Sequence, residues 1–149
     1  MDLKVITNRR REGQEGVAAI EFAILLPLLV VLVFGIIEFS ILLYDKAVIT
    51  NASREGARAG IVFHPSGVSD GEIVFVVNNY CGAHLISFDP SSVITTTIFR
   101  TDEAFGRALT VTVAYQYHFL VLPNFIATLV GGVNLVAETV MRMEDQEGG

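Results

Sequence analysis

The stretch Gly16-Val-Ala-Ala-Ile-Glu-Phe22, continued by an apolar run to Leu43, decides the fold of this chain. No charged residue occurs from Phe22 to Ile37, and Glu38 is the single charge between there and Leu43. A helix rises about 1.5 Å per residue, so this run is long enough to cross a hydrocarbon layer of about 30 Å. Residues 17–43 are therefore predicted to form a transmembrane helix.

Glu21 lies one residue before the uncharged run. An ionised carboxylate near hydrocarbon is costly and marks a functional site that needs a partner. If the chain were cut between Gly16 and Val17, the new amino group would lie four residues before Glu21. The two groups do not readily meet within one helix. The amine of one subunit would instead meet the carboxylate of a neighbour that is shifted along its axis, which would neutralise both charges.

Three segments carry a family resemblance: REGQEGVAAIEFAILLP at 11–27, FGIIEF at 34–39 and NASREGAR at 51–58. They resemble the TadE-like pseudopilins of Tad (Flp) pilus systems, specifically over residues 11–60 and more weakly over 107–144. In that family a prepilin peptidase cuts after the glycine of a G-x-x-x-x-E-F motif. The resemblance therefore implies a processing site made of Gly16, Val17, Glu21 and Phe22, with Glu21 as the fifth residue of the mature chain.

Composition and motifs argue against an enzyme. The net charge is −6, and the leader has four basic and three acidic residues, so cleavage would leave a chain of −7 with six basic residues. Such a chain is not typical of nucleic-acid binding. P-loop, Rossmann, CxxC and HExxH motifs are absent from the sequence, and His64, His84 and His118 lack metal-ligand spacing. We expect no catalytic residue, metal, cofactor, nucleic-acid partner or small-molecule substrate.

Charge on either side of the apolar run predicts its orientation. Lys4 and Arg9–Arg11 precede it, whereas Asp45 and Lys46 nearly cancel after it, so the amino terminus is expected in the cytoplasm. The chain is predicted to be a single-pass protein of the cytoplasmic (inner) membrane, with incorporation into a surface pilus left open. The expected parts are a cleaved leader (1–16), the transmembrane helix (17–43), its extramembrane continuation (44–60), an extracytoplasmic α+β domain (61–143) and an acidic tail (144–149).

Helical signal continues beyond the membrane to Gly60, which gives one helix of about 44 residues from Val17, or about 65 Å. Ala52, Gly56 and Gly60 recur every four residues, a spacing that allows close backbone approach, although fraying from Gly56 is the alternative. Arg54 and Arg58 share a neighbouring face and are available to acidic partners. The expected assembly contacts are Glu21, Pro27, Ala52, Arg54, Gly56, Arg58 and Gly60.

Two residues of the apolar run have alternative interpretations. Pro27 removes a helical hydrogen bond, and it is either a passive kink or a local bend that lets helices pack in a filament. Glu38 lies at the outer edge of the run, where a solvated boundary residue is favoured over an assembly contact.

The remainder predicts a small α+β domain. Ser69 and Glu72 fit a capping box before a second helix that ends near Ala83, although the β-branched residues leave a strand open. Strands are expected at 93–99, at 108–119 where apolar and polar residues alternate, and at 134–143, with a short helix at 125–130. The fold class is thus a long N-terminal membrane-spanning helix followed by a second helix and a roughly three-stranded antiparallel sheet, whose apolar face the first or second helix covers.

Three functions follow, from different classes. The leading interpretation is a minor pseudopilin that acts in the assembly or structure of a Tad pilus. Its expected partners are the prepilin peptidase, other pilins or pseudopilins of the system, an inner-membrane assembly platform and membrane lipid. An uncleaved, signal-anchored extracytoplasmic binding module is the alternative. An anchored enzyme that uses Cys81 and His84 ranks last, because a buried free thiol is the better interpretation of this lone cysteine.

Overall fold

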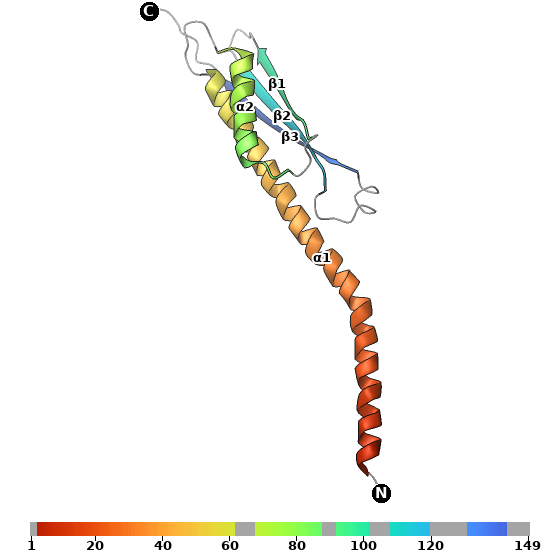
Figure 1. The fold of residues 1–149 in the computed structure, drawn as a ribbon. Coiled ribbons are helices and arrows are strands. Elements are labelled where there is room, and N and C mark those ends of the chain that lie inside the picture. Colours follow the sequence, from red (N-terminus) through yellow and green to blue (C-terminus); the bar gives the residue numbers. More distant parts are fainter. Residues whose placement is uncertain (1–2, 62–67, 88–91, 102–107, 120–130, 143–149) are drawn as a thin grey trace, which may run out of the picture. The chain divides into compact units, whose positions relative to one another are not determined.

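The computed structural model describes residues 3–61, 68–87, 92–101, 108–119 and 131–142. The expected helix at 125–130 and the acidic tail at 144–149 lie outside these residues. The described elements follow in the order α1 (Leu3–Ile61), α2 (Asp70–His84), β1 (Ile94–Thr101), β2 (Ala108–Tyr117) and β3 (Val133–Arg142) (Figure 1). The predicted α+β class, with a long N-terminal helix and a three-stranded antiparallel sheet, is confirmed.

Helix α1 begins earlier than the sequence predicted. It starts at Leu3 rather than at Val17, so the leader is helical as well. Arg, Glu and Gln are good helix formers, and the leader has no proline, so the backbone meets no interruption before the apolar run. The chain forms two compact units, Met1–Ile37 and Glu38–Gly149, and α1 contributes to both.

The sheet has the order β1-β2-β3, and both strand pairs are antiparallel. In β2 the apolar side chains of the predicted alternation all point to one face and are buried, from Leu109 to Tyr117. The register aligns Val111 with Ile98 of β1 and with Thr139 of β3. The face that carries these buried β2 side chains is mainly apolar, and Leu135 and Ala137 of β3 are buried on it as well, as a half-buried sheet requires.

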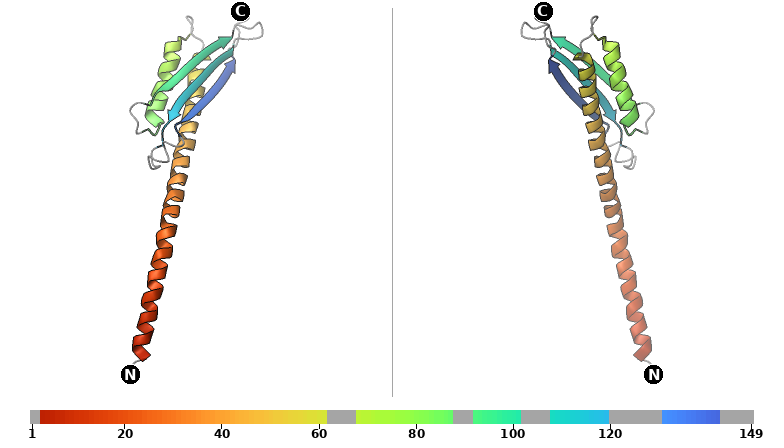
Figure 2. Two further views of the ribbon diagram at one scale, coloured as in Figure 1. Left: turned by 90° about the vertical axis from the view of Figure 1, so that its right-hand side faces the viewer. Right: turned by 90° about the vertical axis from the view of Figure 1, so that its left-hand side faces the viewer.

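Two helices cover that apolar face. Figure 2 shows α2 and the last turns of α1 packed on the same side of the sheet. In α1 the buried positions recur at helical spacing from Asp45 through Ile49, Ala52 and Ala57, so one stripe of this helix faces the core. The sequence predicted that either the first or the second helix covers the apolar face of the sheet. In the structure both helices cover it.

Helix α2 starts as the capping box predicts, so the strand alternative for this segment is wrong. The Ser69 hydroxyl accepts from the Glu72 backbone N–H, and the Glu72 carboxylate accepts from the Ser69 backbone N–H. Arg100 of β1 pairs with Asp70 and donates to the Val68 carbonyl, which ties the start of α2 to the edge of the sheet. The inner face of α2 adds Ile73, Val77 and Cys81 to the core.

Candidate functional site

The first unit presents an apolar helix surface. From Val17 to Val33 every side chain is exposed, including Phe22 at 63% and Leu28 at 68%. Its most apolar window has a mean hydropathy of 2.9, and none of that window is buried, so α1 is a candidate membrane span. Exposed apolar surface on this scale needs lipid or protein to cover it. This surface is suited to insertion in a membrane or to packing against other helices.

Glu21 lies on this surface with its side chain exposed among apolar neighbours. No hydrogen bond or ion pair joins it to any residue that the structure describes. A partner for Glu21 from outside the chain stays a prediction. Pro27 lies inside α1 on the same exposed surface.

Glu38 differs from both sequence interpretations, because it is neither a solvated boundary residue nor an exposed contact. Its side chain is only 2% exposed, and its carboxylate accepts a hydrogen bond from the Tyr117 hydroxyl at the end of β2. Burial, together with this bond to Glu38, raises the pKa of Tyr117, so the phenol stays protonated and donates. No local sequence pattern indicates this pair, although Glu38 lies seven residues before Asp45 on the buried stripe of α1.

The next turns of α1 attach to the domain through further polar contacts. Asp45 is fully buried and accepts the backbone N–H of Ile86, which follows α2, at 3.0 Å. Burial raises the pKa of Asp45, and the bond from Ile86 opposes that effect. Lys46 of α1 donates a hydrogen bond to the backbone carbonyl of Val136 on β3. These contacts hold α1 to both the end of α2 and one edge of the sheet.

The small residues of α1 pack inside the domain. Ala52 is fully buried, and Gly56 and Gly60 are buried as well. A Cβ on Gly56 would lie 2.6 Å from Val77 Cγ2, and one on Gly60 would lie 2.7 Å from Ile73 Cδ1. The close approach that their spacing predicted is therefore intramolecular, because Gly56 and Gly60 of α1 lie against α2 and β2. This corrects the expectation of assembly contacts at these three small residues. The fraying alternative is also wrong, because α1 continues to Ile61.

Arg54 and Arg58 remain available for contacts with other molecules. Both are exposed, as is Glu55 between them, so the three charges lie on the side of α1 that faces away from the sheet. The structure thus divides the expected assembly residues of this segment into a buried, structural set and an exposed, charged set.

Cys81 and His84 do not form a catalytic pair. The thiol lies in the core, and burial raises the pKa of Cys81 to about 11, which disfavours the reactive thiolate. The His84 ring is exposed, stacks on Tyr80 with ring centroids 4.4 Å apart, and bonds through Nδ1 to the Tyr80 carbonyl. Within the described ranges no three His, Cys, Asp or Glu side chains gather as a metal site would require.

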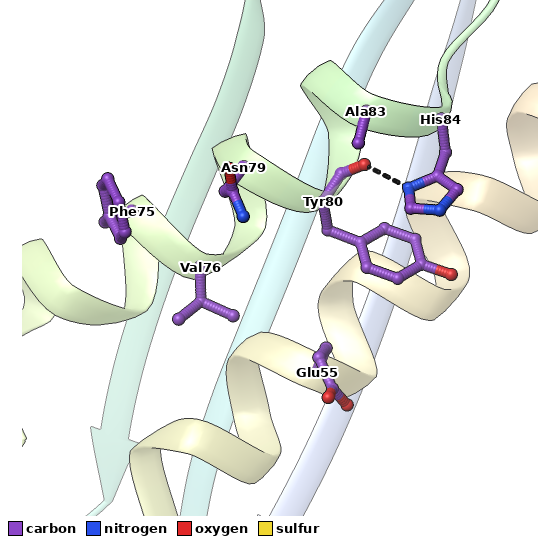
Figure 3. Close-up of a pocket in the computed structure, with 7 residues that line it drawn as sticks. All are labelled: Glu55, Phe75, Val76, Asn79, Tyr80, Ala83 and His84. Carbon is purple, nitrogen blue, oxygen red and sulfur yellow. Dashed lines mark hydrogen bonds between the residues drawn. The ribbon is translucent and has the colours of Figure 1, made fainter.

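An open groove of about 200 Å³ lies between α1 and α2. It is lined by Glu55 from α1 and by six side chains from α2, all labelled in Figure 3. Those side chains are mainly apolar or aromatic: Phe75, Val76, Asn79, Tyr80, Ala83 and His84. No sequence motif marks this groove, because Glu55 lies about 20 to 30 residues before the α2 residues that line it.

Comparison with known proteins identifies the N-terminal segment. Residues 16–58 match the family model of the TadE-like proteins. No curated protein and no solved structure matches the chain. The match confirms the family resemblance over this segment and implies a Tad pilus-associated protein. The TadE-like segment covers the exposed apolar helix, the Glu38 and Asp45 contacts and the charged face at Arg54 to Arg58.

Proposed function

We propose that this chain is a minor pseudopilin of a Tad pilus, anchored by α1 and cut by a prepilin peptidase after Gly16. The observation that carries the proposal is the exposed apolar surface of α1 with Glu21 on it, within the TadE-like segment. The family match begins at Gly16, the residue before the proposed cut. The same apolar surface serves first as a membrane anchor and then as a packing surface for other pilins or pseudopilins.

The anchor needs only the first unit. Because Glu38 is buried in the second unit, the helix surface available to lipid runs from Val17 to Ile37. A helix over this range is about 31 Å long, which still matches a hydrocarbon layer of about 30 Å. The leader, with its basic residues, stays in the cytoplasm, and the α+β domain lies outside. The membrane segment then ends before Glu38.

Glu21 acts as the register residue. After cleavage, the Val17 amine of one subunit pairs with the Glu21 carboxylate of a neighbour that is shifted by four residues, about 6 Å along the helix. Pairing makes both charges tolerable in an apolar surrounding, whereas any other register leaves each unpaired. The inner-membrane assembly platform would then receive a subunit whose axial position is already defined.

Processing is the first test. The full-length protein is purified from membranes of cells that carry a prepilin peptidase, and its mass and amino-terminal sequence are measured beside a Gly16→Leu control. A mature chain that begins at Val17, lost in the control, is the expected result. An intact chain that keeps its leader would contradict the proposal and favour an uncleaved, anchored binding module.

A further inference from the structure

The end of the second unit that begins at Glu38 carries exposed apolar side chains. On α1, Phe39 is 61% exposed, and Leu43 and Tyr44 are exposed too. Phe39 comes two residues after Ile37, where the exposed apolar surface of the first unit ends, so this surface continues along the chain into the second unit. Exposed apolar groups of this kind indicate contact with lipid or with another protein.

Ile86 and Val93 lie at the same end of the second unit, although they are far from α1 in sequence. The backbone N–H of Ile86 donates to the carboxylate of Asp45 on α1. The hydroxyl oxygens of Ser87 and Ser92 are 2.8 Å apart, which brings Val93 close to Ile86. Val93 is 69% exposed, and Ile86 is exposed as well.

The register of the sheet gives the same position for Val93. The Tyr117 hydroxyl at the end of β2 donates to Glu38 of α1, and Ile94 at the start of β1 lies opposite Tyr115. Because β1 and β2 are antiparallel, β1 begins where β2 ends. Val93, one residue before β1, therefore lies at the Glu38 end of the sheet, in agreement with the serine contact.

The charged groups of α1 at this end are not presented to solvent as free charges. Glu38 and Asp45 are buried, and Lys46 donates to the Val136 carbonyl. No Asp, Glu, Lys or Arg occurs in the other described segments at this end, which are 85–87, 92–94, 115–119 and 131–135. An apolar surface that has aromatic groups and lacks exposed carboxylates is suited to the interface between lipid headgroups and acyl chains.

The apolar side chains do not all lie on one side of α1, which favours lipid over a protein partner. Tyr44 is five residues after Phe39, which places it about 140° round the helix. A protein partner covers one side of a helix, whereas before assembly the surface of a bilayer surrounds a single helix on every side. We propose that a rim of five side chains lies in the interfacial region of the bilayer: Phe39, Leu43, Tyr44, Ile86 and Val93. This contact rests on the proposed function, because it takes α1 to be the membrane anchor.

Tryptophan fluorescence tests the contact. The chain has no tryptophan, so a single introduced one is the only indole in the protein. Full-length Phe39→Trp and Val93→Trp are reconstituted in phosphatidylcholine vesicles, with or without bromine atoms on the acyl carbons near the headgroup. Bromine quenches indole on contact, so we expect the brominated lipid to lower the emission of both variants at least about twofold, because the rim lies at the depth of these atoms. Ile86→Trp is a second reporter from outside α1 and should behave in the same way.

Phe99→Trp is the matched control. Phe99 is also exposed and lies on β1, six residues or about 20 Å beyond Val93. Its emission should hardly change, and quenching equal to that of Val93→Trp would overturn the proposal, since lipid would then contact the domain without preference for this end. Unquenched emission from both Val93→Trp and Ile86→Trp would overturn it too. A blue shift at these two positions without quenching would identify a protein cover, such as a second copy, in place of lipid.

Leu28→Trp reports the anchor separately. Leu28 lies in the middle of the proposed membrane segment and is exposed, so lipid with bromine atoms deep in its acyl chains should quench an indole there. Quenching at Leu28 with none at Val93 or Ile86 would reject the rim and leave the proposed anchor standing. No quenching at Leu28 would reject the anchor, and the rim with it.

Discussion

The Tyr117 hydroxyl donates a hydrogen bond to the Glu38 carboxylate across 79 positions of sequence, and both side chains are buried. Tyr117 ends β2, the central strand, and Glu38 is the first residue of the second unit. The pair therefore joins the middle of the sheet to the turn of α1 where the exposed apolar surface gives way to the domain. A carboxylate in this place would be costly without its donor.

Tyr117→Phe removes that donor while keeping the ring. We expect the domain to lose about 1–3 kcal/mol of unfolding free energy, because a buried charged acceptor loses a hydrogen bond. Thermal or denaturant unfolding of the detergent-solubilised protein measures the loss. In a Glu38→Leu background, which lacks the acceptor, the same substitution should cost clearly less, since the two residues act through one bond. Equal costs in both backgrounds would show that the hydroxyl does not act through Glu38.

Gly56→Ala tests the close packing of α1 on α2. The new Cβ would lie 2.6 Å from Val77 Cγ2, in a buried, β-branched side chain that has little freedom to move. We expect a net loss of about 1–2 kcal/mol of unfolding free energy, because overpacking outweighs the better helix propensity of alanine.

Gly82→Ala is the matched control for that substitution, since nothing lies within 4 Å of a Cβ at Gly82 in α2. It should raise the unfolding free energy by up to about 1 kcal/mol through helix propensity alone. If the two variants gained stability equally, Gly56 would not be a packing contact.

The buried carboxyl group of Asp45 should make the unfolding free energy depend on pH. Burial raises its pKa above the ordinary value of 3.8, so the folded state holds the proton more tightly than the unfolded state does. The stability that comes from this tighter proton binding is fully present below the ordinary pKa. It is lost as pH rises through the raised pKa of the folded state. Asp45→Asn should remove this loss and match or exceed the original stability at neutral pH, because the amide oxygen still accepts from Ile86.

Asp45→Ala separates the charge from the hydrogen bond. It leaves the Ile86 N–H without its acceptor and should lower stability at every pH, by about 1–3 kcal/mol. Unfolding curves between pH 4 and about 8 for the three proteins check the prediction. A steeper pH dependence in Asp45→Asn than in the original chain would contradict it.

The sequence predicted those helices and strands that a pattern of neighbouring residues marks. The capping box at Ser69 and Glu72 marked the start of α2, and the alternation in β2 identified both the strand and its buried face. The apolar run marked the candidate membrane helix for the same reason, because its character is a property of consecutive residues.

Contacts between segments that are far apart in the sequence could not be predicted from local pattern. Four-residue spacing at Ala52, Gly56 and Gly60 indicates close packing but does not say whether the neighbour is the same chain or another one. Glu38 looked like a boundary residue because its partner, Tyr117, is far away in sequence. The groove at Glu55 also needs α2 in place. In each case the missing information was which segments the fold brings together.

Glu21→Gln tests the register residue. Glutamine is nearly the same size and tolerates apolar surroundings better than an ionised carboxylate, so membrane insertion and the mass of the mature chain should not change. It cannot neutralise the Val17 amine of a neighbour, so we expect assembly into the pilus to fall sharply, measured as the mature subunit recovered in sheared pilus fractions relative to membranes. Ala23→Ser, a mild polar change on the same exposed helix surface, serves as the control and should assemble normally. Normal assembly of Glu21→Gln would show that the carboxylate does not set the register.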